Sequence, residues 1–473
     1  MTIEPTVEPP AAQGMARSFL ALGAGETLAR LVAFGATVWM ARRLGAGAYG
    51  VVALASAILL YFNYIADFGA DAVGVPRVAR APARVGITVP SLLLARLAIG
   101  AGLWVVLAAV GLLLLPQPEG AVLAALALVL PLRGANVRWA LIGLERSGTV
   151  GAARVLGEAL SAVLVVSFVR HTGQLGSVPV AQVAGDAVAA LALLVALRRL
   201  GVALPIAVDR AEVRGALRDG WPLVLHAILA MLAFNADLVI LRFFRDAATV
   251  GRYAVAYTLV SYLANLGSAF AVSALPALSR AGAADGRDYR TAMAYAAAIA
   301  VPAALGGWVL SGPIIGMIFG ADYAPAGAAL AVLIWNVPAL WLRFTGQMGL
   351  IAAGRQDVVL RVTVIGAVVA IGLDLLIVPR YGMLGAAGVA VGVETLRFVL
   401  VLVLGARAGL PSPGLPRIWR IVVASVVMAV AVRALAGAPV IVGVAAGAVV
   451  YAAALTLLGG VRWRRGAWPQ LVT

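Results

Sequence analysis

The sequence predicts an all-α integral membrane protein with about 14 transmembrane helices, in two parallel six-helix lobes and a C-terminal helix pair. Two observations predict this class: 63% of the residues are hydrophobic against 12% charged, and the second half of the chain repeats the first. Apolar stretches of roughly 20 residues follow one another, and each can cross the hydrocarbon core as a helix. Long runs of Ala, Leu and Val favour helices over the short alternating segments of a barrel.

The two halves repeat at a lag of about 200 residues. The matching pairs are Gly50 with Gly251, Tyr61 with Tyr262, Pro76 with Pro276, Arg146 with Arg355, Gly157 with Gly366, Asp186 with Glu394 and Gly201 with Gly409. The pairs keep their order along most of both halves, as a duplicated helical bundle predicts and shared composition does not. Duplicated membrane bundles are mostly transporters whose substrate site lies between the repeats, near the bilayer midplane.

Hydrophobicity places the spans, and Gly- and Pro-rich breakers separate most of them. The predicted spans are 18–41, 48–69, 89–114, 120–143, 149–170, 178–199, 221–244, 251–275, 291–311, 326–350, 358–378, 383–405, 416–436 and 438–460. The predicted domains are a disordered cytoplasmic tail at 1–16, an N-lobe at 17–200, a cytoplasmic linker at 201–220, a C-lobe at 221–410, the last helix pair at 411–461 and a cytoplasmic tail at 462–473.

The arginines indicate the orientation in the membrane. With the N-terminus inside, the inside loops and tail hold about three times as many arginines as the outside loops, a strong positive-inside signal. Both termini are therefore expected in the cytoplasm. Because each repeat has an even number of helices, the two lobes insert with the same orientation, and a pseudo-twofold axis along the membrane normal is expected.

Composition excludes several classes of function. The chain has no cysteine, so thiol catalysis, disulfides and cysteine-bound metal are ruled out. The net charge of +16 comes from arginines scattered along loops, which indicates topology rather than nucleic-acid binding. A Walker A sequence and His/Asp/Glu metal spacings are absent, so we expect no cofactor and no metal.

Charged residues inside the spans are the candidate functional residues, since a charge at the bilayer centre costs about 2.5–3.5 kcal/mol on insertion scales. Arg133 and Arg343 occupy nearly equivalent places in the two repeats without an obvious local carboxylate, which predicts a wet cationic cavity between the lobes and an anionic substrate. The candidate substrate-binding residues are Arg30, Arg133, Arg154, Arg343, Asn136 and Arg397. The candidate ion-coupling carboxylates are Glu26, Glu158 and Asp237.

A structural role is open for the same charges. Glu26 with Arg30 and Arg154 with Glu158 have i,i+4 spacing, so each pair can close its own salt bridge on one helix face. Glu394 and Arg397 can do so at i,i+3. The arginines near predicted span ends can instead extend to the headgroups. These are Arg96, Arg138 and Arg242.

Several motifs resemble those of the Wzx-type polysaccharide flippases, a branch of the multidrug/oligosaccharidyl-lipid/polysaccharide (MOP) exporter superfamily. The resemblance covers roughly residues 15–410, and each motif is short, so their order and spacing carry it. The matching segments are Ala41-Arg42-Arg43-Leu44-Gly45, Ala66-Asp67-Phe68-Gly69, Asn235-Ala236-Asp237, Val250-Gly251-Arg252-Tyr253, Tyr323-Ala324-Pro325 and Val378-Pro379-Arg380-Tyr381-Gly382.

The resemblance implies a flippase that works by alternating access in the bacterial inner membrane. Its substrate would be a lipid-linked oligosaccharide on polyprenyl pyrophosphate, and its other partners would be membrane lipids and polysaccharide polymerase machinery, with no nucleic acid. A proton or Na⁺ gradient would drive it, and a monomer is expected. Multidrug members of the superfamily usually have twelve helices, so the additional pair favours a lipid-linked cargo.

Two alternatives remain at this point. One is a multidrug or other small-molecule exporter of the same fold, driven by a cation gradient. The other, from a different class, is a membrane glycosyltransferase or polysaccharide polymerase. Such enzymes generally need a sizeable periplasmic loop or an acidic catalytic site at the membrane surface, whereas every outside loop predicted here is short.

Overall fold

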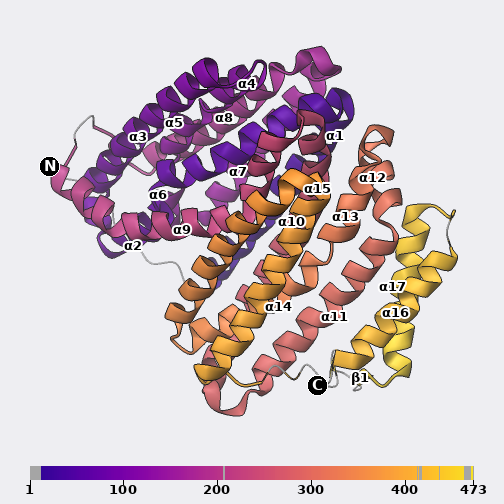
Figure 1. Cartoon of the computed structure of the whole chain (residues 1–473). Coiled ribbons are helices and arrows are strands. Elements are labelled where there is room, and N and C mark those ends of the chain that lie inside the picture. The colour runs from indigo at the N-terminus through magenta and orange to yellow at the C-terminus, as the bar shows by residue number, and fades with distance from the viewer. Residues whose placement is uncertain are drawn as a thin grey trace. The chain divides into compact units, whose positions relative to one another are not determined.

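The structure is a computed structural model that describes residues 12–205, 208–412, 414, 418–435, 437–462 and 470–471. The chain forms two compact units, Met1–Ile228 and Leu229–Thr473, which are called the N-lobe and the C-lobe below (Figure 1). Each lobe is a bundle of helices. The described residues contain two strands, and each of these is two residues long.

The N-lobe comprises eight α-helices, two short 3-10 helices and the first part of a ninth α-helix in its described residues. Their bounds are α1 (Ala12–Asp67), α2 (Ala70–Arg80), η1 (Pro82–Arg84), α3 (Val85–Leu114), α4 (Glu119–Leu126), α5 (Val129–Gly134), α6 (Arg138–Gly143), α7 (Ser147–Phe168), η2 (Thr172–Gln174), α8 (Ser177–Arg199) and α9 (Arg210–Phe244).

The C-lobe contains the rest of α9 and the remaining described elements. These are α10 (Ala247–Asp285), α11 (Arg287–Val309), α12 (Ser311–Phe319), η3 (Ala321–Tyr323), α13 (Ala326–Leu333), α14 (Asn336–Ala352), α15 (Gln356–Arg407), α16 (Trp419–Ala434), α17 (Val440–Leu457), β1 (Val461–Arg462) and β2 (Gln470–Leu471). The strands β1 and β2 pair antiparallel, with Val461 opposite Leu471.

The predicted all-α membrane fold is confirmed. Within the described residues, 10 helical stretches are long and apolar enough to cross a membrane. Two of these stretches each hold two predicted spans, because α1 bends at Gly45 (φ 74°) and α15 bends at Gly382 (φ 59°), both positive-φ positions that favour glycine. Together with α9 and α16, the stretches account for all the predicted spans.

Local geometry supports the duplication. Span 120–143 is broken into α4, α5 and α6, and span 326–350, which follows at about the lag of the repeat, is broken into α13 and α14. At the end of each broken span the same turn recurs, since the N–H of Arg146 donates to the carbonyl of Leu141 and the N–H of Arg355 donates to that of Leu350, both at 2.8 Å. The pseudo-twofold relation between the lobes stays a prediction.

Several predicted boundaries differ from those of the elements. Residues 1–11 of the predicted disordered tail lie outside the described residues, whereas 12–16 already belong to α1. Half of the predicted linker 201–220 is helical because α9 begins at Arg210, and residues 206–207 lie outside the described residues. In the predicted tail 462–473, residues 463–469 and 472–473 lie outside them as well. The short helices α2 and α12 form in segments expected to be loops.

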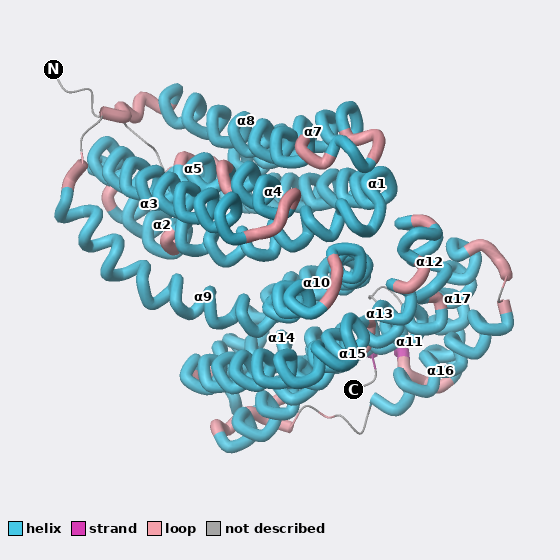
Figure 2. Tube along the Cα trace, turned by 45° about the horizontal axis from the view of Figure 1, so that its top comes forward, coloured by secondary structure: helices cyan, strands magenta, loops and turns pink. Residues whose placement is uncertain are grey.

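Packing within the N-lobe places the site described next. Helix α1 packs along α7, and α7 packs along α8, while α3 lies against α4 and α5 (Figure 2). Small residues let these helices approach closely, as in membrane bundles generally. Large apolar side chains such as Leu113 and Val163 are exposed on the outside, where they suit lipid rather than water.

Candidate functional site

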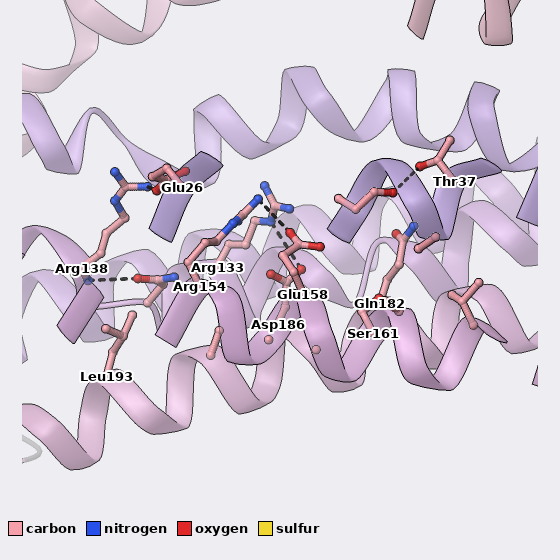
Figure 3. Close-up of a pocket in the computed structure, with 18 of the residues that line it drawn as sticks. Glu26, Thr37, Arg133, Arg138, Arg154, Glu158, Ser161, Gln182, Asp186 and Leu193 are labelled. Carbon is pink, nitrogen blue, oxygen red and sulfur yellow. Dashed lines mark hydrogen bonds and ion pairs between the residues drawn. The ribbon is translucent and has the colours of Figure 1, made fainter. Parts of the chain in front are cut away.

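A cavity of about 210 Å³ lies inside the N-lobe, between α1, α7, α8 and the broken segment α5–α6 (Figure 3). Three arginines and three carboxylates line it, together with neutral polar side chains. The charged residues are Glu26, Arg133, Arg138, Arg154, Glu158 and Asp186, and the neutral polar ones are Thr37, Asn136, Ser161 and Gln182. A polar chamber inside an apolar membrane lobe marks a functional site by default.

Close backbone contacts hold the carboxylates at the cavity. A Cβ on Gly157 would lie 2.6 Å from the carbonyl oxygen of Gly185, and a Cβ on Gly185 would lie 2.6 Å from that of Gly157, so α7 and α8 touch through glycine. The next residue after each glycine is acidic, namely Glu158 and Asp186. Gly25 has the same role on α1, because its Cβ would lie 2.7 Å from the backbone of α7, and it precedes Glu26.

Each cavity arginine faces a carboxylate. Arg154 pairs with Glu158 at 2.8 Å along α7, Arg133 lies 3.6 Å from Asp186, and Arg138 lies 3.7 Å from Glu26. Arg138 also lies 3.3 Å from Asp71 on α2. Between 23% and 40% of each of the six cavity side chains is exposed, so water and ligands reach the pairs.

Arg96 on α3 organises the segment that carries these arginines. It is 4% exposed, and it pairs with Asp67 at 2.8 Å. Its guanidinium also donates to the carbonyls of Arg133 (3.0 Å) and Asn136 (2.7 Å), which lie at the break between α5 and α6. The expectation that Arg96 extends to the headgroups is therefore wrong, because these backbone acceptors and Asp67 hold it inside the lobe.

Five predicted residues meet at this cavity: Glu26, Arg133, Asn136, Arg154 and Glu158. The expectation that Arg133 lacks a carboxylate is wrong, since Asp186 comes from a helix far along the sequence. The prediction for Arg138 as a headgroup anchor is also wrong, since it lines the cavity. Arg30 is exposed and does not line this cavity. Among the described residues, the sequence analysis did not name Asp186 as a site residue. Its repeat partner Glu394, a charge within a predicted span, could have pointed to it.

The C-lobe holds a second charged cluster, which is sealed. Arg343 on α14 donates to Glu394 on α15 and to Gln347 at 2.8 Å, and Arg397 lies 3.4 Å from Glu394. The side chains of Arg343, Glu394 and Arg397 are only 5–8% exposed. The guanidinium of Arg343 also lies 4.4 Å from the ring centroid of Phe344.

This cluster corrects the sequence prediction for the C-lobe. Arg343 does have a carboxylate partner, because Glu394 on the neighbouring helix accepts a hydrogen bond from it. The i,i+3 pair of Glu394 and Arg397 forms as the spacing allowed. Arg343 and Arg397 therefore connect α14 to α15, and neither lines the cavity of the N-lobe.

Asp237 on α9 lies in a third polar group, within the C-lobe. Its carboxylate accepts hydrogen bonds from the hydroxyl of Tyr253 and from the N–H of Leu238 at 2.8 Å. Asp374 on α15 is 2% exposed, and its Oδ1 has no hydrogen-bond partner. Neither Asp237 nor Asp374 forms a salt bridge among the described residues.

Comparison with protein families decides the membership. Residues 15–281, more than half of the chain, match the family described as "Polysaccharide biosynthesis protein". The chain belongs to this polysaccharide biosynthesis family. Comparison with curated protein sequences finds no match. The matched residues include the N-lobe from residue 15 onward and all the residues that line its charged cavity.

Solved structures share the fold of this polysaccharide biosynthesis protein. The inward closed conformation of the lipid II flippase MurJ is similar over 93% of this chain and 98% of its own, with a TM-score of 0.77 and 12% identity. An inward-facing multidrug resistance MATE family transporter of the MOP superfamily is similar over 80% of this chain and 93% of its own, with a TM-score of 0.65 and 17% identity.

A third structure is a MOP superfamily transporter from Pyrococcus furiosus, described by the reverse polarity of its binding pocket. It covers 84% of this chain and 95% of its own, with a TM-score of 0.54 and 17% identity. These similarities establish that the chain has the MOP exporter fold, which is the fold expected from the sequence motifs.

Proposed function

We propose that this protein flips an undecaprenyl-linked oligosaccharide or polysaccharide precursor from the cytoplasmic to the periplasmic leaflet of the bacterial inner membrane. Membership in the polysaccharide biosynthesis family and the fold shared with a lipid II flippase over nearly the whole chain support this substrate class. The movement is alternating access of the two lobes. Both termini lie in the cytoplasm, as the arginine bias of the loops requires.

The observation that carries the proposal is the charged cavity of the N-lobe. Six ionisable side chains and four neutral polar ones gather there inside a lobe whose surface exposes large apolar side chains. Holding charges at membrane depth is costly, so such a group persists where it serves a substrate. Arg133, Asn136 and Arg154 are the proposed contacts to the polar head of the substrate, with Arg30, Arg343 and Arg397 outside this cavity.

Energy coupling is assigned to a carboxylate in the C-lobe. Glu26 and Glu158 each have an arginine partner, whereas Asp237 accepts from a tyrosine hydroxyl and forms no salt bridge among the described residues. A proton or Na⁺ bound at Asp237 would change the charge of a buried site, and a differential charge of this kind can shift a conformational equilibrium. Membrane lipids and a polysaccharide polymerase are the proposed partners of the monomeric protein.

The test uses cells and proteoliposomes. Depleting the protein is expected to make one lipid-linked glycan accumulate in the inner leaflet, and wild type is expected to restore its passage. In proteoliposomes, flipping is expected to depend on ΔpH or Na⁺, and Asp237→Asn is expected to remove that dependence while Glu26→Gln keeps it. Accumulation of no glycan, together with efflux of a small cationic drug, would instead identify a multidrug exporter.

A further inference from the structure

The charges that line the N-lobe cavity balance. Three guanidinium groups, from Arg133, Arg138 and Arg154, face three carboxylates in the lining, whereas Asp71, which also lies beside Arg138, is outside the lining. A site for a phosphate or an acidic sugar needs excess positive charge. If an anion took one of these arginines, the carboxylate partner would lose its counter-charge in a partly buried site, which is costly.

Two of the three ion pairs are open to a ligand that both donates and accepts hydrogen bonds. The Arg133–Asp186 and Arg138–Glu26 distances of 3.6 and 3.7 Å exceed the 2.7–3.2 Å of a hydrogen bond. The Nε atoms of Arg133 and Arg138 and the Oε1 of Glu26 have no hydrogen-bond partner and are hidden from solvent. A sugar hydroxyl in the cavity can bridge the members of such a pair once their side chains turn toward it, because it accepts from N–H and donates to a carboxylate at once.

From this geometry, and resting on the proposed function, we infer that the N-lobe cavity binds an uncharged, hydroxyl-rich sugar ring of the lipid-linked glycan rather than its pyrophosphate or an acidic sugar. The volume agrees, since about 210 Å³ is below the roughly 300–1,000 Å³ of pockets that enclose a drug-sized ligand. The cavity holds one ring, and the neutral side chains of Thr37, Ser161 and Gln182 extend the same pattern of paired donors and acceptors.

The experiment compares one ring in three charge states. Binding of glucose, glucuronate and glucosamine to the full chain in lipid nanodiscs is measured by saturation-transfer NMR at low and high salt. Wild type is expected to bind glucose most tightly, with little change on adding salt, because no net charge attracts the ligand. Asp186→Asn leaves the cavity with one excess positive charge and is expected to shift the preference toward glucuronate by about fivefold.

Arg133→Gln makes the opposite change and is expected to shift the preference toward glucosamine by about fivefold. Asp357→Asn is the matched control, since it removes a half-exposed carboxylate of the C-lobe that pairs with Arg355. It is expected to leave the order of the three sugars unchanged. Size-exclusion profiles establish that each variant is folded.

The results separate this inference from the proposed function. Tighter binding of glucuronate by wild type, with affinity that falls as salt rises, overturns the inference. So does the absence of binding for all three sugars when the same preparation flips lipid-linked glycan. If the charge series behaves as expected but no lipid-linked glycan is flipped, the proposed function fails while the neutral-sugar cavity stands.

Discussion

The two lobes carry the same ion pair in two different states. In the N-lobe, Arg133 and Asp186 lie 3.6 Å apart, and 40% and 23% of their side chains are exposed to a cavity. In the C-lobe, the repeat partners Arg343 and Glu394 are hydrogen bonded directly and are only 8% and 5% exposed. Duplication therefore preserved the charges, whereas the surrounding packing decides whether a ligand can reach them.

One residue accounts for much of the difference. Ala189 lines the N-lobe cavity and lies three residues after Asp186. The residue three positions after Glu394 in the C-lobe is Arg397. A Cβ on Gly157 would lie 2.8 Å from the Cβ of Ala189, and a Cβ on Gly366 would lie 2.2 Å from the Nε of Arg397. The side chain of Arg397 thus packs on Gly366, whereas the repeat counterpart Gly157 contacts the backbone of Gly185 and the methyl group of Ala189.

The comparison teaches that buried charge by itself does not mark a binding site. The C-lobe cluster satisfies Arg343 with Glu394, Gln347 and the ring of Phe344, which suits a helix-to-helix connection. Both clusters leave an arginine Nε without a hydrogen-bond partner, at Arg133 and Arg154 in the N-lobe and at Arg397 in the C-lobe, but only Arg133 and Arg154 line the cavity. Unused polar atoms next to a cavity are the better indicator of ligand binding.

The largest effect is expected for Arg343→Ala. Removing one partner leaves Glu394 buried with only the longer contact to Arg397, so the free energy of unfolding is expected to fall by about 3–5 kcal/mol. Denaturant unfolding in mixed micelles measures this loss. Arg355→Ala, which removes a 40% exposed arginine paired with Asp357, is the control and is expected to change stability by less than about 1 kcal/mol. Wild-type stability of Arg343→Ala would show that the C-lobe cluster is not a structural connection.

Arg133→Ala is expected to reduce function strongly and stability only slightly. Its pair is long and half-exposed, so stability is expected to fall by less than about 1 kcal/mol. Glycan flipping is expected to fall by about tenfold, the effect of losing roughly 1.4 kcal/mol of binding. Flipping rates in proteoliposomes measure this loss, and Arg355→Ala is again the control because its side chain is equally exposed. A variant that flips normally would remove Arg133 from the substrate site.

The helices were predictable because their signals are local. Apolar runs and breakers place the spans, and the glycine at each sharp bend, Gly45 and Gly382, lies in a breaker or directly before a predicted span. The breaks inside spans 120–143 and 326–350 were not predicted, although Pro131, Gly134 and Asn136 at the first break disfavour a continuous helix. Arg96 stabilises the first break through long-range contacts that sequence spacing does not reveal.

The site was only partly predictable because pairing depends on how helices face each other. Arg154 and Glu158 are four residues apart, and their bridge follows from helix geometry. Arg133 and Asp186 meet only because α7 and α8 touch through Gly157 and Gly185 and bring α8 to the end of α5. The sequence therefore located the charges and predicted their partners within one helix, but not their partners on other helices.

Ala189→Leu tests whether open volume, rather than charge, distinguishes the lobes. The longer side chain fills the cavity beside Gly157 without altering an ion pair, and overpacking is expected to cost about 1–3 kcal/mol. Sugar binding by NMR and glycan flipping are expected to disappear together. Ala189→Ser, which adds a single hydroxyl, is the control and is expected to retain both. Flipping that persists in Ala189→Leu would mean that the substrate does not enter this cavity.

The smallest effect concerns the helix junction at which the lobes also differ. Gly45 bends α1 in the N-lobe, and its repeat counterpart Asp246 is the N-cap of α10, where its carboxylate accepts from the N–H of Thr249 at 3.2 Å. The hydroxyl of Thr249 donates to the same carboxylate and holds the pKa of Asp246 below its ordinary value. Asp246→Ala is therefore expected to lower stability by about 1 kcal/mol at neutral pH.

The pH dependence follows from the direction of that pKa. Because the folded state holds Asp246 ionised more strongly than the unfolded chain does, its contribution is complete above the ordinary pKa of about 4 and is lost as the pH falls through the lower folded value. Wild type and Asp246→Ala are thus expected to differ in unfolding midpoint at pH 7 and to converge under strongly acidic conditions. A difference of the same size at both pH values would mean that the aspartate acts through packing. In that case the two repeat counterparts, Asp246 and Gly45, would differ in side-chain packing and not in charge.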